Sequence, residues 1–397
     1  MSTVASLRGL GRELDGPAGL GRAFDELLAA RSEPALLALG EPAHGVEAFP
    51  LLRNELLGHL VDRGYRSIAL EIDFFAAAAV DDYVNGATAE LDAVLATGFS
   101  HGFGAVPGNR ELVEWLREHN AGRPPHDRVR FYGFDAPVEY SGAPSPRRAL
   151  FSVVDHLPAA LRPASVRDLD ALLGEEADWT NPAAMYDPAA SIGDSDRARA
   201  LRIVADDLTS ALHRAAPGLR PTDPTGHAHA AAHARTARGL LRYHAAMAGT
   251  GTDRIPTLSS VRSEMMAENL LAIVDREQRR GPCLVFAHNN HLRPGADDVA
   301  WGSAGAMVGL TLGERYLFLA TDACLDREPG TLQHVLAEAT TRRALFPAPA
   351  LRAALPPSLG TGRPMVRGHL PLTRADLSGA DAVVFITDTD GKQHRYW

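Results

Sequence analysis

Acidic and imidazole side chains stand directly after four apolar runs of the sequence. The runs have the length and composition of buried strands, and the chain turns polar where each one ends. The groups that follow them are, in chain order, Glu41 with His44, Glu71 with Asp73, Asp135, and His288 with His291. Carboxylates and imidazoles can exchange protons near neutral pH without a cofactor. Because ligands of α/β sheets bind at the carboxyl ends of the strands, this pattern predicts an acid–base site there.

Four of these side chains fit the steps of a hydrolysis by water. We expect His44 to be the general base, because neutral imidazole, with a pKa near ~6.5, accepts a proton from water at neutral pH. Glu41 lies three residues earlier in the same loop and would orient the imidazole or the water, with a helix cap as its alternative. Glu71 would bind or polarise the water together with a histidine. His288 would stabilise the developing oxyanion or protonate the leaving alkoxide.

A second set of side chains is expected to contact the substrate: Arg262, Asp73, Asp135, His291, Trp179 and Tyr186. The guanidinium fork of Arg262 suits a carboxylate or an oxyanion, and a structural ion pair with Glu264 or Asp135 is its alternative. Asp73 has a solvated helix cap as its alternative.

Two aromatic residues of this set, Trp179 and Tyr186, lie near prolines in a broken stretch typical of ligand clefts. Their alternative is the core between helices. His229 and His233 stand four residues apart on a predicted helix, a spacing that can bind zinc. No acid is aligned with them, and we interpret the pair as a solvated helix face.

Other catalytic templates find little support. The sequence contains neither HExxH nor a GxxxxGK[ST] loop, and Cys283 and Cys324 fall in or next to apolar runs that favour inert thiols. We therefore expect attack by an activated water, with no cofactor and no metal. Two alternatives stay open. One is a metal-dependent hydrolase that uses the same carboxylates and imidazoles as ligands. The other is a biosynthetic tailoring enzyme or binding protein that uses the pocket for a non-hydrolytic acid–base reaction.

The elements that must position these groups are strands buried on both faces, since the apolar runs are continuous rather than alternating. Helical spacing separates them, for example over residues 49–61 and 111–119. This succession predicts an α/β fold with a central, mostly parallel sheet flanked by helices. The strand-like runs are residues 35–39, 67–70, 129–132, 284–287, 316–319 and 382–386.

A long stretch in the middle of the chain differs from the rest. Residues 144–252 contain no strand-like run and are rich in Ala, Leu, Arg and Asp at helical spacing. We interpret them as a large helical insertion, a cap over the site, between two halves of an α/β core at 1–143 and 253–397. Pro182, Pro188 and the stretch 217–224 are expected to break its helices.

Bulk properties narrow the class of partner. The chain has 397 residues and a formal net charge of −9, which argues against nucleic acid as the main partner. We see neither a secretory signal nor a membrane-spanning stretch, so we expect a cytoplasmic protein. The expected partner is a small-molecule ester or lactone, and the sequence leaves the oligomeric state open.

The motifs of the chain resemble those of the erythromycin esterase family, in the family's order. The matching segments are Gly40-Glu41-Pro42-Ala43-His44-Gly45, Ile68-Ala69-Leu70-Glu71-Ile72-Asp73, Tyr83-Val84-Asn85-Gly86, Trp115-Leu116-Arg117 with Asn120, Phe131-Tyr132-Gly133-Phe134-Asp135, Arg262-Ser263-Glu264-Met265-Met266-Ala267-Glu268-Asn269-Leu270, and Ala287-His288-Asn289-Asn290-His291. Members of that family hydrolyse macrolide lactones without a required metal, using a histidine and glutamates in a deep cleft. The resemblance implies an α/β fold, a water-attack mechanism, and a role in antibiotic resistance or biosynthesis. The insertion and the tail match poorly, and we expect them to shape substrate choice.

Overall fold

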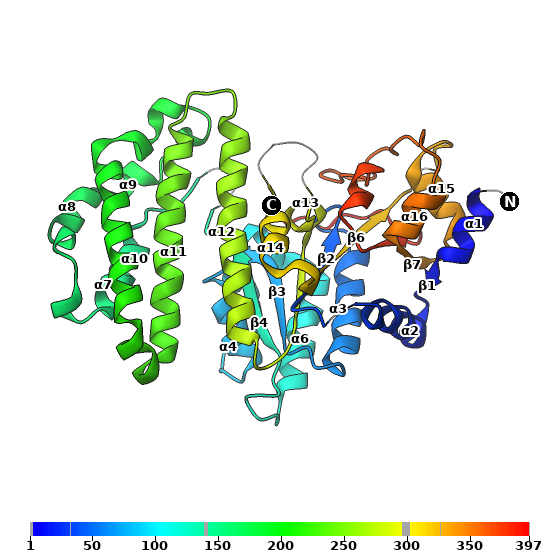
Figure 1. The fold of residues 1–397 in the computed structure, drawn as a ribbon, viewed down its shortest axis with the longest axis horizontal. Coiled ribbons are helices and arrows are strands. Elements are labelled where there is room, and N and C mark those ends of the chain that lie inside the picture. The colour runs from blue at the N-terminus through cyan, green and yellow to red at the C-terminus, as the bar shows by residue number, and fades with distance from the viewer. Residues whose placement is uncertain (1–2, 32, 139–141, 296–301, 326, 397) are drawn as a thin grey trace. The chain divides into compact units, whose positions relative to one another are not determined.

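The computed structural model describes residues 3–31, 33–138, 142–295, 302–325 and 327–396. The chain forms two compact units, Met1–Phe134 with Leu270–Trp397, and Asp135–Asn269. The first contains the sheet, and the second is helical (Figure 1). The second unit extends beyond the predicted insertion at 144–252, because it also takes in residues 135–143 and 253–269. That the insertion caps the site stays a prediction.

Eight strands of the described residues form one sheet in the order β1-β7-β8-β6-β2-β5-β3-β4. Strand β2 pairs in parallel with β5 and β6, β5 pairs in parallel with β3, and β6 with β8. Strand β7 is antiparallel to both of its partners, β1 and β8. The strands are β1 Arg12–Glu13, β2 Leu36–Glu41, β3 Ser67–Asp73, β4 Arg130–Asp135, β5 Cys283–His288, β6 Tyr316–Ala323, β7 Arg343–Pro347 and β8 Ala382–Ile386. The mostly parallel sheet predicted from the sequence is therefore confirmed.

Strand burial follows the apolar runs from which the strands were predicted. Every residue of β2, β5, β6 and β8 is buried, as expected for parallel strands covered on both faces. Sequence analysis did not predict β1 and β7. Strand β1 has only two residues, both exposed, and therefore carries no apolar signal. In β7 the apolar run is only three residues long, between Arg343 and Pro347, which is shorter than the runs of the central strands.

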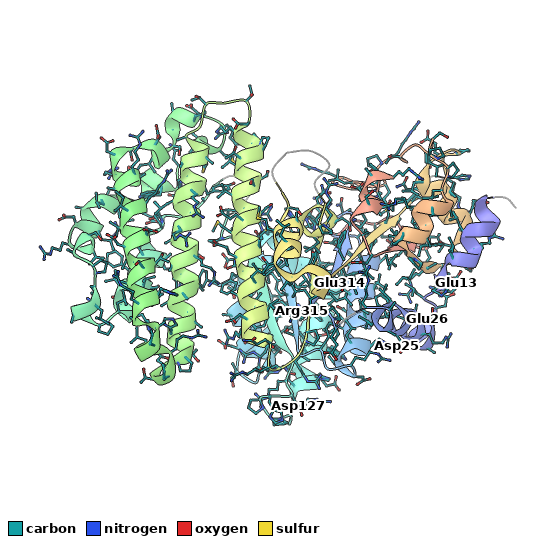
Figure 2. The ribbon with its side chains drawn as sticks, viewed as in Figure 1. Glu13, Asp25, Glu26, Asp127, Glu314 and Arg315 are labelled. Carbon is teal, nitrogen blue, oxygen red and sulfur yellow. The ribbon has the colours of Figure 1, made fainter. Side chains whose placement is uncertain are left out.

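Helices of the first unit cover the sheet and fix its edges. Arg12 of β1 pairs with Glu26 on α2 at 2.8 Å, which ties α2 to the edge strand. Figure 2 labels Glu26 on this helix and Glu13 on the strand. The core on one side combines apolar residues of α2, α3 and α6 with those of β2, β3 and β5. The helices are α1 Thr3–Leu10, α2 Gly16–Ala29, α3 Ala48–Val61, α4 Ala77–Val84, α5 Leu91–Gly98, α6 Pro107–Asn120, α13 Asn289–Leu292, α14 Ala304–Leu312, α15 Leu332–Ala339 and α16 Ala348–Ala354.

The second unit has its own apolar core between helices. Its helices are α7 Arg147–His156, α8 Leu169–Leu173, α9 Glu176–Trp179, α10 Asp196–Thr222 and α11 Pro224–Met247, and α12, Arg254–Glu277, begins in it. The predicted break in the stretch 217–224 is present, but Pro217 and Pro221 do not cause it. Both prolines lie inside α10. The two prolines are four residues apart, so the hydrogen bonds that they remove lie on one side of the last turns. The break comes at Asp223, which caps α11 by accepting from Gly226 N. No helix in the described ranges combines the length and the apolar character needed to cross a bilayer.

Candidate active site

The register of the sheet brings three of the predicted residues to one edge. Glu41, the last residue of β2, is opposite His288, the last residue of β5. Strand β5 also pairs with β3, with Phe286 opposite Leu70, so Glu71 follows on the other side of the same strand end. All three side chains are buried. Parallel pairing thus collects the polar ends of strands that are far apart in sequence.

His44 lies between two buried carboxylates. Its Nδ1 is 2.7 Å from Oε1 of Glu41, and its Nε2 is 3.8 Å from Oε1 of Glu71. The loop that carries it turns at Gly45, whose φ of 79° is a left-handed conformation suited to glycine. The first distance is a hydrogen bond, whereas the second leaves a gap between imidazole and carboxylate.

Burial sets the electrostatics of Glu41. Desolvation raises the pKa of its carboxyl group, and the hydrogen bond with His44 and the charge of Arg53 act in the opposite direction. One of its oxygens, Oε1, contacts His44. The other, Oε2, is buried with no hydrogen-bond partner among the described residues. A buried carboxylate oxygen normally has a partner, so Oε2 is open to one supplied from outside the chain.

A small cavity lies beside these groups. Its volume is about 30 Å³, which is room for one or two water molecules. The polar residues that line it are Glu41, His44, Arg53, Glu71 and Asn109. A water in this cavity would therefore contact both carboxylates and the imidazole.

Arg53, on α3, is a site residue that sequence analysis missed. Its side chain is fully buried, and burial lowers the pKa of its guanidinium to about 10. It donates from Nη1 to Asn109 Oδ1 at 2.7 Å and from Nη2 to Gly108 O at 2.9 Å. A signal was present in the sequence: Arg53 lies four residues after Phe49, on the apolar face of its helix, where a charged residue needs a partner.

Glu71 accepts hydrogen bonds from the segment that follows β5. Its Oε2 accepts from the backbone N–H of His288 at 2.8 Å, and its Oε1 is 3.2 Å from Nε2 of His291. His291 is thus in direct contact with a predicted catalytic carboxylate. The sequence interpretation had ranked it below His288.

Both ring nitrogens of His288 contact backbone groups. Its Nε2 is 3.0 Å from the carbonyl oxygen of Pro42, and its Nδ1 accepts from Asn290 N at 3.2 Å. The neutral His288 ring therefore carries its proton on Nε2. Burial lowers the pKa of His288 to about 4, and the neighbouring His44 acts in the same direction. This geometry makes His288 a neutral clasp between the end of β5 and the loop that carries His44.

Asn289 ties three strand ends together. Its side chain donates to the carbonyl of Thr321 and accepts from the N–H of the same residue, at 2.8 and 3.2 Å. The hydroxyl of Thr321 donates to Gly40 O at 2.7 Å. A Cβ at Gly40 would lie 2.0 Å from Asn289 Oδ1, so the strand end needs glycine for this close approach. The floor of the site is correspondingly rigid.

Other predicted contact residues have structural partners. Asp73 accepts from the backbone N–H groups of Phe75 and Ala76, which is the helix-cap alternative. Arg262 forms a two-point ion pair with Asp135, at 2.9 and 2.5 Å, which is the ion-pair alternative. Both members of that pair belong to the second unit.

The two aromatic residues of the second unit differ from each other. Trp179 is 2% exposed in the core of that unit, and its Nε1 donates to Leu173 O at 2.8 Å. The expectation that it lines a cleft is therefore corrected in favour of its core alternative, because the indole fills space between helices. Tyr186 is 81% exposed.

His229 and His233 contact each other through their Nε2 atoms at 3.3 Å. His233 is buried, so the pair is not the fully solvated face expected from the sequence. Within the described ranges, no group of three or more His, Cys, Asp or Glu residues is arranged to hold a metal ion.

One serine motif was overlooked in favour of water attack. Residues Gly98 to Gly102 have the spacing G-x-S-x-G, with Ser100 at its centre. In serine hydrolases this motif is a turn between a strand and a helix. Here it follows helix α5 and enters the 3-10 segment Ser100–Ala105, and Ser100 Oγ accepts from Asp73 N at 2.8 Å. The structural context of a nucleophilic serine is absent from this described segment.

Comparisons with known proteins agree on a family and a fold. A family model described as erythromycin esterase matches residues 60–324. A search of curated proteins finds no match. Among solved structures, the chain is similar to a protein from Bacillus cereus, with 14% identity, a TM-score of 0.72, and coverage of 97% of this chain and 96% of that one. It is similar to a succinoglycan biosynthesis protein, with 14% identity, a TM-score of 0.66, and coverage of 97% and 96%. It is also similar to a mutant of the erythromycin esterase EreC in an open conformation, with 18% identity, a TM-score of 0.66, and coverage of 93% and 94%.

Proposed function

The chain belongs to the erythromycin esterase family, and on that premise we propose that it hydrolyses an ester or lactone with a water molecule activated by His44. The observation that carries the proposal is the position of the His44 ring, 2.7 Å from one buried carboxylate and 3.8 Å from another. An imidazole held in this way has one nitrogen oriented by a carboxylate and the other directed toward a second carboxylate, which suits a general base.

Glu41 sets the tautomer of the base. An ionised carboxylate only accepts hydrogen bonds, so the proton between the two groups belongs to His44 Nδ1. The lone pair of Nε2 then faces the side of Glu71, next to the cavity of about 30 Å³. In the proposed step, Nε2 takes a proton from the water while the water oxygen attacks the substrate carbonyl. The negative charge of Glu41 stabilises the imidazolium that forms.

Glu71 and His291 are proposed to act on the other side of the water. Glu71 Oε1 accepts from His291 and lies nearest to His44 Nε2, so it can hold the water by its second hydrogen. We assign to His291 the role of stabilising the oxyanion or protonating the leaving alkoxide, which sequence analysis gave to His288. The ring nitrogens of His288 contact Pro42 and Asn290, whereas the His291 side chain is 24% exposed.

Arg53 is proposed to balance the charge beneath the site. Two carboxylates, Glu41 and Glu71, border the same small cavity, and two like charges in a poorly solvated space disfavour each other. Desolvation raises the pKa of Glu41, and the charge of the buried guanidinium counteracts part of this rise. The guanidinium therefore helps to keep the acceptor of the His44 proton ionised at neutral pH.

A substrate panel with matched variants tests this function. Purified wild type, His44→Ala and Glu71→Gln proteins are assayed by mass spectrometry with macrolide lactones, smaller lactones and aryl esters. We expect hydrolysis by wild type and a loss of at least ~100-fold in each variant, the scale of general acid–base catalysis. His126→Ala, on a side chain 77% exposed, serves as the control. Unchanged turnover by a folded His44→Ala protein contradicts the assignment, as does a wild type that hydrolyses no member of the panel.

Metal dependence is tested separately. We expect full activity after dialysis against a chelator and no stoichiometric metal by elemental analysis, since the proposed water is activated by imidazole and carboxylate. Activity that disappears with a bound metal and returns on adding it back would favour the metal-dependent alternative.

A further inference from the structure

The segment of residues 391–396 lies along the loop that carries His44. Gln393 forms an isolated antiparallel bridge with Val46, and its Nε2 donates to His44 O at 2.9 Å. His394 N donates to Gly45 O at 2.8 Å. Three consecutive residues of the loop, 44 to 46, are thus held by a segment more than 340 positions away in sequence.

Tyr396 extends this contact to the ring of His44 itself. The two ring centroids are 6.0 Å apart and the rings are nearly perpendicular, at 88°. Phe103 completes the cluster, with its centroid 5.0 Å from Tyr396 and 4.9 Å from His44. Edge-to-face contacts of this kind favour one orientation of the rings over others.

Two glycines make room for the segment. Gly45 has a φ of 79°, and a Cβ there would lie 2.6 Å from His394 O and 3.1 Å from the Tyr396 ring. Gly102 has a φ of 71°, and its Cβ would lie 1.6 Å from Tyr396 O. Any other residue at either position would displace the segment.

The backbone next to Gly102 shows the same fit. His101 is buried with a φ of 57°, a conformation that non-glycine residues adopt only when their surroundings enforce it. Strain of this kind clusters at functional sites. The loop after α5 is therefore shaped around the backbone of Tyr396.

We propose that Tyr396 is a positioning residue of the active site and that residues 391–396 form the wall beside the general base. The role rests on the proposed function of His44. The hydrogen bond with Glu41 fixes one nitrogen of the imidazole. The rings of Tyr396 and Phe103 then restrict how the imidazole can rotate about this hydrogen bond. Nε2 is thereby held toward the water cavity and Glu71. Since the wall is aromatic, the part of the substrate next to His44 is apolar.

Three variants separate positioning from simple stability. In Tyr396→Ala the ring is lost, and we expect kcat to fall roughly 10- to 100-fold, the scale of a misplaced catalytic group. Tyr396→Phe keeps the ring and should retain most of kcat. His126→Ala, at a side chain that is 77% exposed, is the control and should leave kcat unchanged.

A readout independent of turnover accompanies the kinetics. The rate of modification of His44 by diethyl pyrocarbonate is measured by peptide mass spectrometry, with the other histidines of the chain as internal references. We expect the rate to rise several-fold in Tyr396→Ala and to stay at the wild-type value in Tyr396→Phe. This measurement decides the positioning role even if no ester is hydrolysed, so it separates this inference from the proposed function.

Specific outcomes overturn the inference. An unchanged His44 modification rate in folded Tyr396→Ala shows that the ring does not cover the base. Equal losses of kcat in the Phe and Ala variants show that the ring is not what positions it. If Tyr396→Ala unfolds, Gln393→Ala removes the hydrogen bond to His44 O instead, and the same rise in modification rate is required.

Discussion

The hydrogen bonds and the burial of His288 predict how the stability of the protein depends on pH. Burial lowers the pKa of this histidine from its ordinary 6.5 to about 4 in the folded protein. Between these two values the unfolded chain binds a proton at His288 and the folded chain does not. The free energy of unfolding therefore falls as pH decreases through this window, and the contribution is fully present only above pH 6.5.

The magnitude follows from the size of the shift. Each pH unit is worth about 1.4 kcal/mol, so a shift from 6.5 to about 4 corresponds to about 3 kcal/mol when the window has been crossed. Protonation in the folded state also removes the acceptor for Asn290 N at Nδ1. The turn from β5 into α13 then loses this hydrogen bond, and the imidazole beside the His44 ring becomes charged. Acid is thus expected to reduce activity and stability together.

Urea unfolding of wild type and His288→Gln at several pH values between 7 and 4.5 measures this contribution. Glutamine does not titrate, so the variant lacks this pH dependence. At pH 7 the free energy of unfolding of wild type should exceed that of His288→Gln, and this difference should decrease by about 2 to 3 kcal/mol on going to pH 4.5. His126→Gln, at an exposed position, should show no such change. An advantage that stays constant across this range would refute the neutral, buried clasp.

Other substitutions have consequences that follow from named contacts. Trp179→Ala should lower stability by roughly 3 to 5 kcal/mol in thermal melts, because the buried indole fills the core of the second unit, whereas exposed Tyr186→Ala should change it by less than about 0.5 kcal/mol. Arg53→Met should cost roughly 3 to 5 kcal/mol in urea unfolding, since it leaves the buried acceptors Asn109 Oδ1 and Gly108 O without the donors of the guanidinium and removes a positive charge near Glu41. Glu41→Gln should keep the fold and lower kcat, with KM nearly unchanged, because the developing imidazolium loses its negative partner. A wild-type kcat in this last variant would remove Glu41 from the mechanism.

Continuous apolar runs were sufficient to predict most of the sheet. The runs around Leu36, Ile68, Phe131, Leu284, Phe318 and Val384 all became strands, because central parallel strands are buried on both faces. The strands β1 and β7 at the antiparallel edge could not be predicted in the same way. Strand β1 is two exposed residues and β7 has an apolar run of only three, so both are too short to be recognised without their pairing partners. The helix break expected in the stretch 217–224 is present, but its place at Asp223 could not be predicted from Pro217 and Pro221, because both prolines lie inside α10.

The site could be predicted as far as strand ends determine it. Glu41, Glu71 and His288 follow directly from parallel register, and His44 and His291 lie three residues beyond two of these ends. Their detailed roles depend on contacts that no local pattern encodes. The carbonyl of Pro42 and the N–H of Asn290 make His288 a clasp, and this is visible only once both nitrogens are placed. Tyr396 carries no signal in the sequence near His44, because its contact closes a loop of about 350 residues.

A second acid–histidine pair at the same sheet shows what distinguishes a reactive pair from a structural one. Asp322, near the end of β6, contacts His369 at 3.0 Å, much as Glu41 contacts His44. Both oxygens of Asp322 are saturated, by the Ala323 N–H, the Leu372 N–H and the Gln333 side chain in addition to the imidazole. The remaining nitrogen of His369 accepts from a backbone N–H, and both side chains are fully buried. That pair ties the segment before β8 to the sheet. Its oxygen and nitrogen atoms already have hydrogen-bond partners within the protein, so none is left to contact a substrate. Glu41 differs because one of its oxygens has no hydrogen-bond partner in the described chain, and because Glu41 and His44 both line a cavity. The open oxygen and the cavity, rather than the mere presence of an acid and an imidazole, support the chemistry proposed for Glu41 and His44.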